Sequence, residues 1–142
     1  MKRIVCATRG GAASRRVQEQ AIALARQHSA KLTFLFVADT SSCGRVSEEL
    51  TEILEDELKR MGRSLLHIAY VRAHEQGVEA EMLIRCGPVR QTILDVVRET
   101  EADALFVGAP RPATSTPEFG EEGMRDFAAE VKQTTGAEVF IV

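Results

Sequence analysis

The 142-residue sequence predicts an α/β protein with one domain, residues 1–142, built on a single open five-stranded parallel sheet with helices on both faces. Two observations predict this fold. Short apolar runs typical of buried strands alternate along the chain with segments whose apolar residues recur every three or four positions, which is the helical period. Consecutive parallel strands also need a long crossover between them, and the helical segments provide it.

The first half of the chain begins with a continuous apolar run over residues 4–7, which predicts a strand buried on both faces. We expect Ser14 to cap the helix that follows and this helix to end near His28. A second buried strand is predicted over residues 32–37. The core-facing positions of the helix between these strands are Val17, Ala21, Leu24 and Ala25.

Residues 46–76 have the pattern of one long helix. Without a break it would be about 45 Å long, which is too long for so small a domain, so we expect a bend at Gly62. The acidic residues between 48 and 57 are predicted to form a solvated face. An apolar stripe, which we expect to pack against the core, consists of Leu50, Leu54, Leu58, Met61, Leu65 and Ile68.

The second half of the chain continues the alternation. Residues 78–85 alternate apolar and charged side chains at first, which indicates a strand near a sheet edge. Pro88 is expected in the first turn of the next helix, which packs through Val89, Ile93, Leu94 and Val97. A buried strand over 104–107 and a proline-containing loop over 108–116 follow. The last helix, ended by Gly136, and a terminal strand over 139–142 complete the pattern.

The composition argues against several classes of protein. The net charge is −3, aromatic residues make up 5% and tryptophan is absent, so we expect no nucleic-acid partner. No apolar stretch approaches the roughly 20 residues that span a bilayer, and no signal peptide is recognisable. The three cysteines have no CxxC spacing, which indicates a reducing compartment. We therefore expect a cytoplasmic protein without membrane insertion.

No catalytic or metal-binding motif is recognisable, since the P-loop, GxGxxG, GxSxG and HExxH patterns are all absent. We expect no enzymatic activity and no metal site, with His67 and His74 as solvated side chains. Cys6 is expected in the core. Cys86 precedes a helix N-terminus, where a thiolate is favoured, so a redox pair with Cys43 is an alternative to two ordinary reduced thiols.

A ligand site is expected at one edge of the sheet. In open α/β sheets, ligands bind beyond the carboxyl ends of the strands, where the strand order reverses. The segment ATRGG, residues 7–11, follows the first predicted strand and so lies at such an end. The loop that begins after Val107 lies at another.

Several pieces of the sequence occur in an order that resembles the universal stress protein family over essentially the whole chain. They are residues 4–8 entering a helix, residues 35–39 closing the second strand, Gly87-Pro88 followed by Ile93-Leu94, and residues 102–108. The last piece, ADALFVG, resembles the family's ADLIVVG and is the most specific. The resemblance implies a Rossmann-like sheet, similar to that of the adenine-nucleotide alpha hydrolases, with strand order 3-2-1-4-5.

The resemblance also implies an adenine-nucleotide site. Family members that bind ATP carry an Asp after the first strand and a G-x-x-G-x9-G-S/T segment after the fourth, which holds phosphates through backbone amides and a hydroxyl. In this chain the position of the Asp is occupied by Arg9 and that of the second Gly by Arg111. The candidate site residues, which together predict a degenerate site, are Thr8, Arg9, Val37, Gly108, Arg111 and Gly120.

The Gly-Ser step of that segment is missing in either alignment of the chain. One register places Gly120-Glu121 there and the other places Arg125-Asp126, and neither has a Gly followed by a hydroxyl. An acidic side chain beside the phosphates would cost about 1 kcal/mol or more at ~4 Å. Thr116-Pro117-Glu118 also resembles a helix start, so the last helix is able to begin early and fill the site.

The sequence thus favours a stress-response or regulatory module that acts through dimerisation and an unknown protein partner, with no obligatory cofactor. A homodimer through residues 139–142 is expected, because this apolar edge strand lacks lysine, proline and glycine. One alternative is a member that binds ATP or AMP through a remodelled phosphate loop, in which Arg9 contacts the phosphates. The other is a regulatory module of a membrane transporter, a role that some relatives play.

Overall fold

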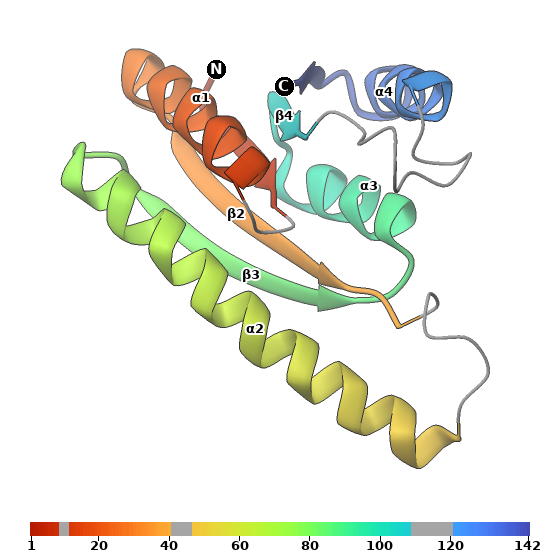
Figure 1. Ribbon diagram of the computed structural model, residues 1–142. Helices are drawn as coiled ribbons and strands as arrows, with labels where there is room; N and C mark the ends of the chain where they lie inside the picture. The colour runs from red at the N-terminus through yellow and green to blue at the C-terminus, as the bar shows by residue number, and fades with distance from the viewer. Residues whose placement is uncertain (9–11, 41–46, 109–120) are drawn as a thin grey trace.

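A computed structural model describes residues 1–8, 12–40, 47–108 and 121–142, with only the backbone described for Ala12, Ala13 and Glu121. Its centre is an all-parallel five-stranded sheet of order β3-β2-β1-β4-β5 (Figure 1). This confirms the predicted fold class and strand order. The strands are β1 (Arg3–Ala7), β2 (Lys31–Ala38), β3 (Ala80–Cys86), β4 (Ala104–Val107) and β5 (Glu138–Ile141).

The helices cover both faces of the sheet. Side chains of α1 and α2 pack on one face, and those of α3 and α4 pack on the other (Figure 1). Alternate residues of β1 separate the two layers, since Ile4 and Cys6 belong to the first and Val5 to the second. The helices are α1 (Ala12–His28), α2 (Glu48–Glu75), α3 (Val89–Thr100) and α4 (Glu121–Thr135).

The start of α1 differs from the sequence prediction. The helix already begins at Ala12, so Ser14 lies in its first turn and is buried rather than capping it. A serine, which favours caps and turns, misled the prediction, whereas the buried face of the helix decides where it starts. The predicted core positions Val17, Ala21 and Ala25 are buried, and the helix ends at His28 as expected.

The expected bend in α2 is absent. Glu48–Glu75 forms one helix of 28 residues, about 42 Å long, which Ser47 caps by accepting a hydrogen bond from the Leu50 backbone N–H. Gly62 has a different purpose. A Cβ at this position would lie 2.5 Å from the Phe36 ring, so the glycine lets α2 approach β2 closely. Close packing, not flexibility, explains this residue.

The apolar stripe of α2 also lies differently from the prediction. Leu50, Met61 and Ile68 are 43, 47 and 50% exposed, so the expectation that the stripe packs against the core was wrong for them. The residues that the sheet buries are Gly62, Leu66, Ala69 and Ala73. These four residues lie beside the apolar stripe on the surface of the helix. The stripe therefore lies at the side of the face of α2 that contacts the sheet.

The first half of α2 reaches beyond the sheet, which explains part of this exposure. The helix rises about 21 Å before Gly62, the residue that packs on Phe36. Strand β2 continues from Phe36 only to Ala38, or about 7 Å. Figure 1 accordingly shows the yellow end of α2 past the arrowheads of β2 and β3. No pattern in the sequence indicates where the sheet ends relative to the helix.

The remaining boundaries agree closely with expectation. β3 lies at one edge with mostly exposed or half-buried residues, and Pro88 is the cap of α3 rather than part of its first turn. Gly136, with φ of +80°, follows α4 in the left-handed region that glycine favours. Of the loop predicted over residues 108–116, Gly108 is described and follows β4, while the rest of the loop and the early helix start at residues 116–118 lie outside the described residues.

Candidate functional site

The carboxyl edge of the sheet is the predicted ligand site, and three candidate residues are described there. Thr8 follows β1, Val37 lies near the end of β2 and Gly108 follows β4. Since β1 lies between β2 and β4, these strand ends are neighbours at the point where the strand order reverses. The other three candidates, Arg9, Arg111 and Gly120, lie outside the described residues.

Thr8 is bound into the protein interior. Its side chain is only 4% exposed, and its backbone N–H donates to the Leu35 carbonyl at 2.9 Å. The Thr8 hydroxyl accepts a hydrogen bond of 3.1 Å from the Gln18 side-chain amide on α1. Thr8 therefore links the end of β1 to β2 through its backbone and to α1 through its side chain.

Gln18 and Arg72 continue this contact into a chain of hydrogen bonds that sequence reasoning missed. Gln18 is 4% exposed, and its Oε1 accepts from the Arg72 guanidinium at 3.0 Å. Arg72 belongs to α2, so the chain joins two helices to the end of β1. The available signal was a polar residue, Gln18, beside Val17 on the buried face of an amphipathic helix.

Gly108 lies on the same side of the sheet as Thr8. A Cβ at Gly108 would be 3.7 Å from Val17 Cγ2, an ordinary contact, so no described neighbour forbids a side chain there. Val37 packs instead with the layer of α3 and α4. The structure thus brings Thr8 and Gly108 together on the α1 side and leaves Val37 on the opposite face.

The start of α4 is attached to α3 near this edge. The Arg90 guanidinium donates to the Gly123 carbonyl at 3.2 Å and lies 5.2 Å from the centre of the Phe127 ring. Both contacts hold the positive charge against the first two turns of α4. Arg90 thus fixes one helix on the other.

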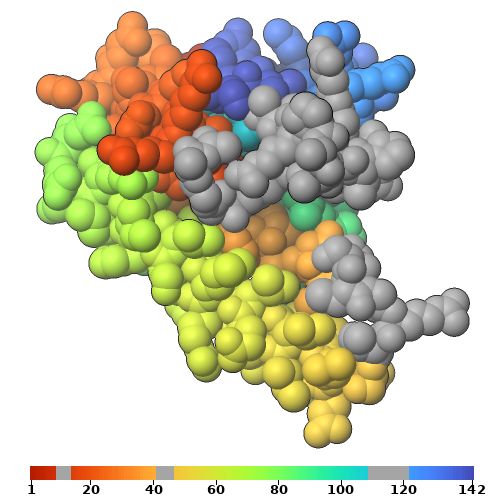
Figure 2. Space-filling view, in the orientation of Figure 1, coloured from red at the N-terminus to blue at the C-terminus, as the bar shows by residue number. Residues whose placement is uncertain are grey.

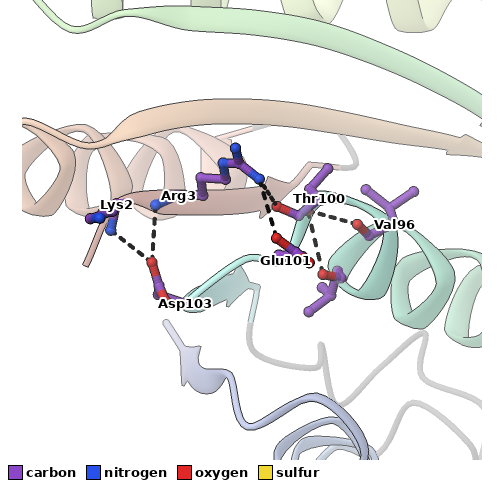
Figure 3. Close-up of polar contacts among 7 residues, drawn as sticks. Lys2, Arg3, Val96, Thr100, Glu101 and Asp103 are labelled. Carbon is purple, nitrogen blue, oxygen red and sulfur yellow. Dashed lines mark hydrogen bonds and ion pairs between the residues drawn. The ribbon is translucent and has the colours of Figure 1, made fainter.

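The amino edge of the sheet carries a second polar cluster (Figure 3). Asp103 Oδ2 accepts hydrogen bonds from the backbone N–H groups of Lys2 at 2.7 Å and Arg3 at 3.2 Å. These donors lower the pKa of the Asp103 carboxyl. The Arg3 guanidinium donates to the Thr100 carbonyl and forms a 3.8 Å ion pair with Glu101. The cluster joins β1 to the segment between α3 and β4.

A small cavity of about 140 Å³ lies beside this cluster, lined by residues that include Arg3, Lys31, Thr33 and Glu81. Glu81 forms a 3.3 Å ion pair with Lys31 and accepts a hydrogen bond of 3.2 Å from the Thr33 hydroxyl. Lys31, Thr33 and Glu81, which line the cavity, therefore bind one another. The cavity is also at the edge opposite to the predicted ligand site.

The cysteines and histidines are placed as follows. Cys6 is buried, as expected, and burial raises the pKa of its thiol to about 12. Cys86 is exposed, while Cys43 lies outside the described residues, so their pairing stays a prediction. His67 and His74 are exposed, and the His74 ring stacks on Tyr70 with centroids 6.2 Å apart. Within residues 1–8, 12–40, 47–108 and 121–142, no three metal-ligating side chains gather.

Among the described helices, none combines the length and the apolar character needed to cross a membrane.

Comparison with known proteins identifies the family of this fold and site. The family model described as Universal stress protein family matches residues 1–119, and the chain belongs to this family. No curated protein matches the chain in sequence.

Solved structures support the same fold. The universal stress protein UspA from Lactobacillus plantarum is 19% identical with a TM-score of 0.74, and the match covers 99% of this chain and 97% of that one. The Archaeoglobus fulgidus universal stress protein in complex with dAMP is 19% identical, with a TM-score of 0.62 and coverage of 99% and 96%. A universal stress protein family protein from Arabidopsis thaliana with AMP bound is 19% identical, with a TM-score of 0.65 and coverage of 100% and 91%.

Proposed function

We propose that this universal stress protein is a non-catalytic regulatory module that acts through dimerisation and protein contacts, and that its nucleotide site is degenerate. The observation that carries the proposal is the burial of Thr8. Its hydroxyl, at the switch point of the sheet, accepts a hydrogen bond from Gln18, and the residue as a whole is only 4% exposed. Because the described polar side chain of the site is already hydrogen-bonded within the protein, the site has few polar groups left to bind a ligand.

The sequence around the site supports the same proposal. Arg9 stands where nucleotide-binding relatives have an aspartate, and Arg111 stands where they have the second glycine. A guanidinium only donates hydrogen bonds and so cannot accept those that a carboxylate accepts from a ligand. A side chain in place of a glycine also obstructs the close approach of backbone amides to phosphates.

A nucleotide-binding module with a remodelled site is the second candidate. The observation that favours it is Gly108, which is half-buried at the carboxyl edge and whose missing side chain no described neighbour requires. Two similar structures contain dAMP and AMP. In this alternative, Arg9 and Arg111 supply positive charge to the phosphates.

Isothermal titration calorimetry with ATP and with AMP, each in the presence of Mg²⁺, separates the two candidates. The proposal predicts dissociation constants weaker than ~100 μM, or about −5.5 kcal/mol. A low-micromolar constant that weakens in Arg9→Ala, but not in the exposed control Arg16→Ala, would establish the second candidate instead. Denaturing the purified protein should likewise release no stoichiometric nucleotide that mass spectrometry detects.

Strand β5 supports the dimerisation part of the proposal. The backbone N–H of Glu138 donates to the carbonyl of Asp103, just before β4, at 3.0 Å, and that of Val142 donates to the carbonyl of Val107 in β4 at 2.9 Å. Because N–H groups alternate sides along a strand, those of Val139 and Ile141 point away from the sheet. An apolar edge with free donors pairs readily with the same strand of a second copy across a two-fold axis.

A further inference from the structure

Exposed apolar side chains concentrate on α2. Eight large hydrophobic side chains are exposed in the described part of the chain, and five of them belong to this one helix. A surface of this kind in a soluble protein usually marks an interface. The five are Leu50, Ile53, Met61, Ile68 and Val71.

These residues form one continuous band, which we call the outer seam. Together with the exposed Glu57 and Ser64, they recur every three or four positions from Leu50 to Val71. This spacing keeps them on one face of the helix over three heptads. That face is separate from the buried line of Gly62, Leu66, Ala69 and Ala73. The outer seam is therefore a face that the protein's own sheet does not cover.

The charges on α2 divide at its middle. Residues 48–57 contain six acidic side chains and no lysine or arginine. Residues 59–74 contain four lysines or arginines and two histidines, and the one acidic residue of this half is Glu75 at the end of the helix, beyond the outer seam. The helix midpoint falls beside Met61, so each half of the outer seam is flanked by charge of one sign. A helix with this arrangement is complementary to itself when reversed.

We propose that the outer seam pairs antiparallel with the outer seam of a second copy of this chain. A two-fold axis near Met61 places the acidic half of each helix along the basic half of the other, while the exposed apolar residues meet between them. Glu49 and Asp56 are acidic residues on the same flank of the outer seam. In the antiparallel pair they face the basic half of the partner copy's helix, which contains Arg63 and His67.

This contact is independent of the pairing of β5. Strand β5 lies at one end of the sheet, whereas α2 packs against β2 and β3 at the other end. A chain with both contacts has two different two-fold interfaces and assembles beyond a dimer. Figure 2 shows the yellow surface of the first half of α2 projecting away from the red and blue parts of the molecule.

Cross-linking at the centre of the outer seam tests the proposal. Met61→Cys and the control Lys59→Cys are made in a chain with Cys43→Ser, Cys86→Ser and Ile141→Pro, and are treated with a short bismaleimide. Cys6 is buried and does not react. Met61 is exposed and Lys59 is half-buried, and two residues along a helix turn about 200° around its axis, so only Met61 lies in the outer seam. Labelling with a monofunctional maleimide checks that both thiols react, and we expect dimer from Met61→Cys at several times the yield from Lys59→Cys.

A charge exchange supplies the second measurement. Glu49→Lys with Asp56→Lys reverses the acidic half, and Arg63→Glu with His67→Glu reverses the basic half. Sedimentation velocity should show that each variant alone associates about tenfold more weakly and that an equal mixture recovers association. Equal cross-linking of the two cysteine variants, or a mixture no stronger than its components, overturns the proposal. Because β5 pairing is blocked by Ile141→Pro, neither outcome depends on the proposed function.

Discussion

The two edges of the sheet differ in how they meet solvent. At the β3 edge, Glu81 pairs with Lys31 at 3.3 Å and Arg85 pairs with Glu99 at 2.8 Å, so charges line the strand. At the β5 edge the strand itself has only one charged residue, Glu138, and its tip carries Ile141 at 40% exposure. Charged side chains on an edge strand discourage pairing with another strand, and an apolar edge lacks this protection.

This difference predicts that the two edge strands of the sheet contribute to different properties of the protein. The β3 end depends on α2, which packs against β2 through Gly62, and so it contributes to the stability of the monomer. The β5 end has outward N–H groups that can donate to a second chain, and the dimer contact that we propose lies there. Substitutions at the two ends should therefore change different quantities.

The largest effect is expected for Ile141→Pro, which removes an N–H that points away from β4. Proline is tolerated on an edge strand where the N–H faces outward, so the monomer should keep its stability. The dimer loses two symmetry-related hydrogen bonds, each leaving an unpaired acceptor at about 1–3 kcal/mol. In a chain whose outer-seam pairing is blocked by Glu49→Lys with Asp56→Lys, light scattering behind size exclusion should show the mass fall from about twice 15.6 kDa to that of a single chain.

Ile141→Ala is the matched control, because it shortens the side chain but keeps the N–H. This variant should remain dimeric at micromolar concentration, with only the weakening due to lost apolar contact. If the wild type and Ile141→Pro are both monomeric at high micromolar concentration, the assignment of β5 to dimerisation is wrong. The outer seam of α2 is then measured separately by its own cross-linking.

A smaller effect, on stability rather than mass, is expected for Gly62→Ala. The new Cβ would lie 2.5–2.9 Å from three atoms of the Phe36 ring, so the helix or the ring must move. Overpacking of this kind costs about 1–3 kcal/mol, partly offset by the roughly 1 kcal/mol better helix propensity of alanine. Urea unfolding should show a lower midpoint, and exposed Ser64→Ala should not.

The smallest effect is expected for Asp103→Asn at the amino edge, between the two ends. The N–H groups of Lys2 and Arg3 lower the pKa of Asp103 in the folded protein below its unfolded value of about 3.9. The stabilisation by the carboxylate is therefore complete above the unfolded pKa and is lost as the pH falls through the folded pKa. Denaturant midpoints should differ at pH 7 and converge near pH 2. A constant difference across this range would contradict the explanation.

Much of the fold could be predicted because its strands are short apolar runs. Residues 104–107 were predicted to the residue, since every one of them is buried in a parallel sheet. The orientation of α2 could not be predicted, because its apolar residues extend over more of the helix than the sheet covers. Leu66 and Ile68 have similar side chains, yet one is fully buried and the other is 50% exposed.

The candidate site was less predictable. The positions of Thr8, Val37 and Gly108 at strand ends followed from the alternation of strands and helices. That Thr8 binds Gln18, and Gln18 binds Arg72, depends on how α1 and α2 pack, and no local pattern in the sequence carries this information. Gln18 differs from its apolar neighbours only by being polar, a signal that many surface residues share.

The central place of β1 in the sheet has a consequence for synthesis on the ribosome. Ile4 pairs with Leu32 on one side and with Ala104 on the other. At about 5–20 residues per second, the β4 partner of β1 leaves the ribosome roughly 5–20 s after β1 itself. During this interval a nascent chain with β1, β2 and β3 paired has the β4-pairing edge of β1 open and an uncovered apolar face that includes Val5 and Leu35. Chaperones that shield such surfaces should therefore engage this chain before α3 is complete.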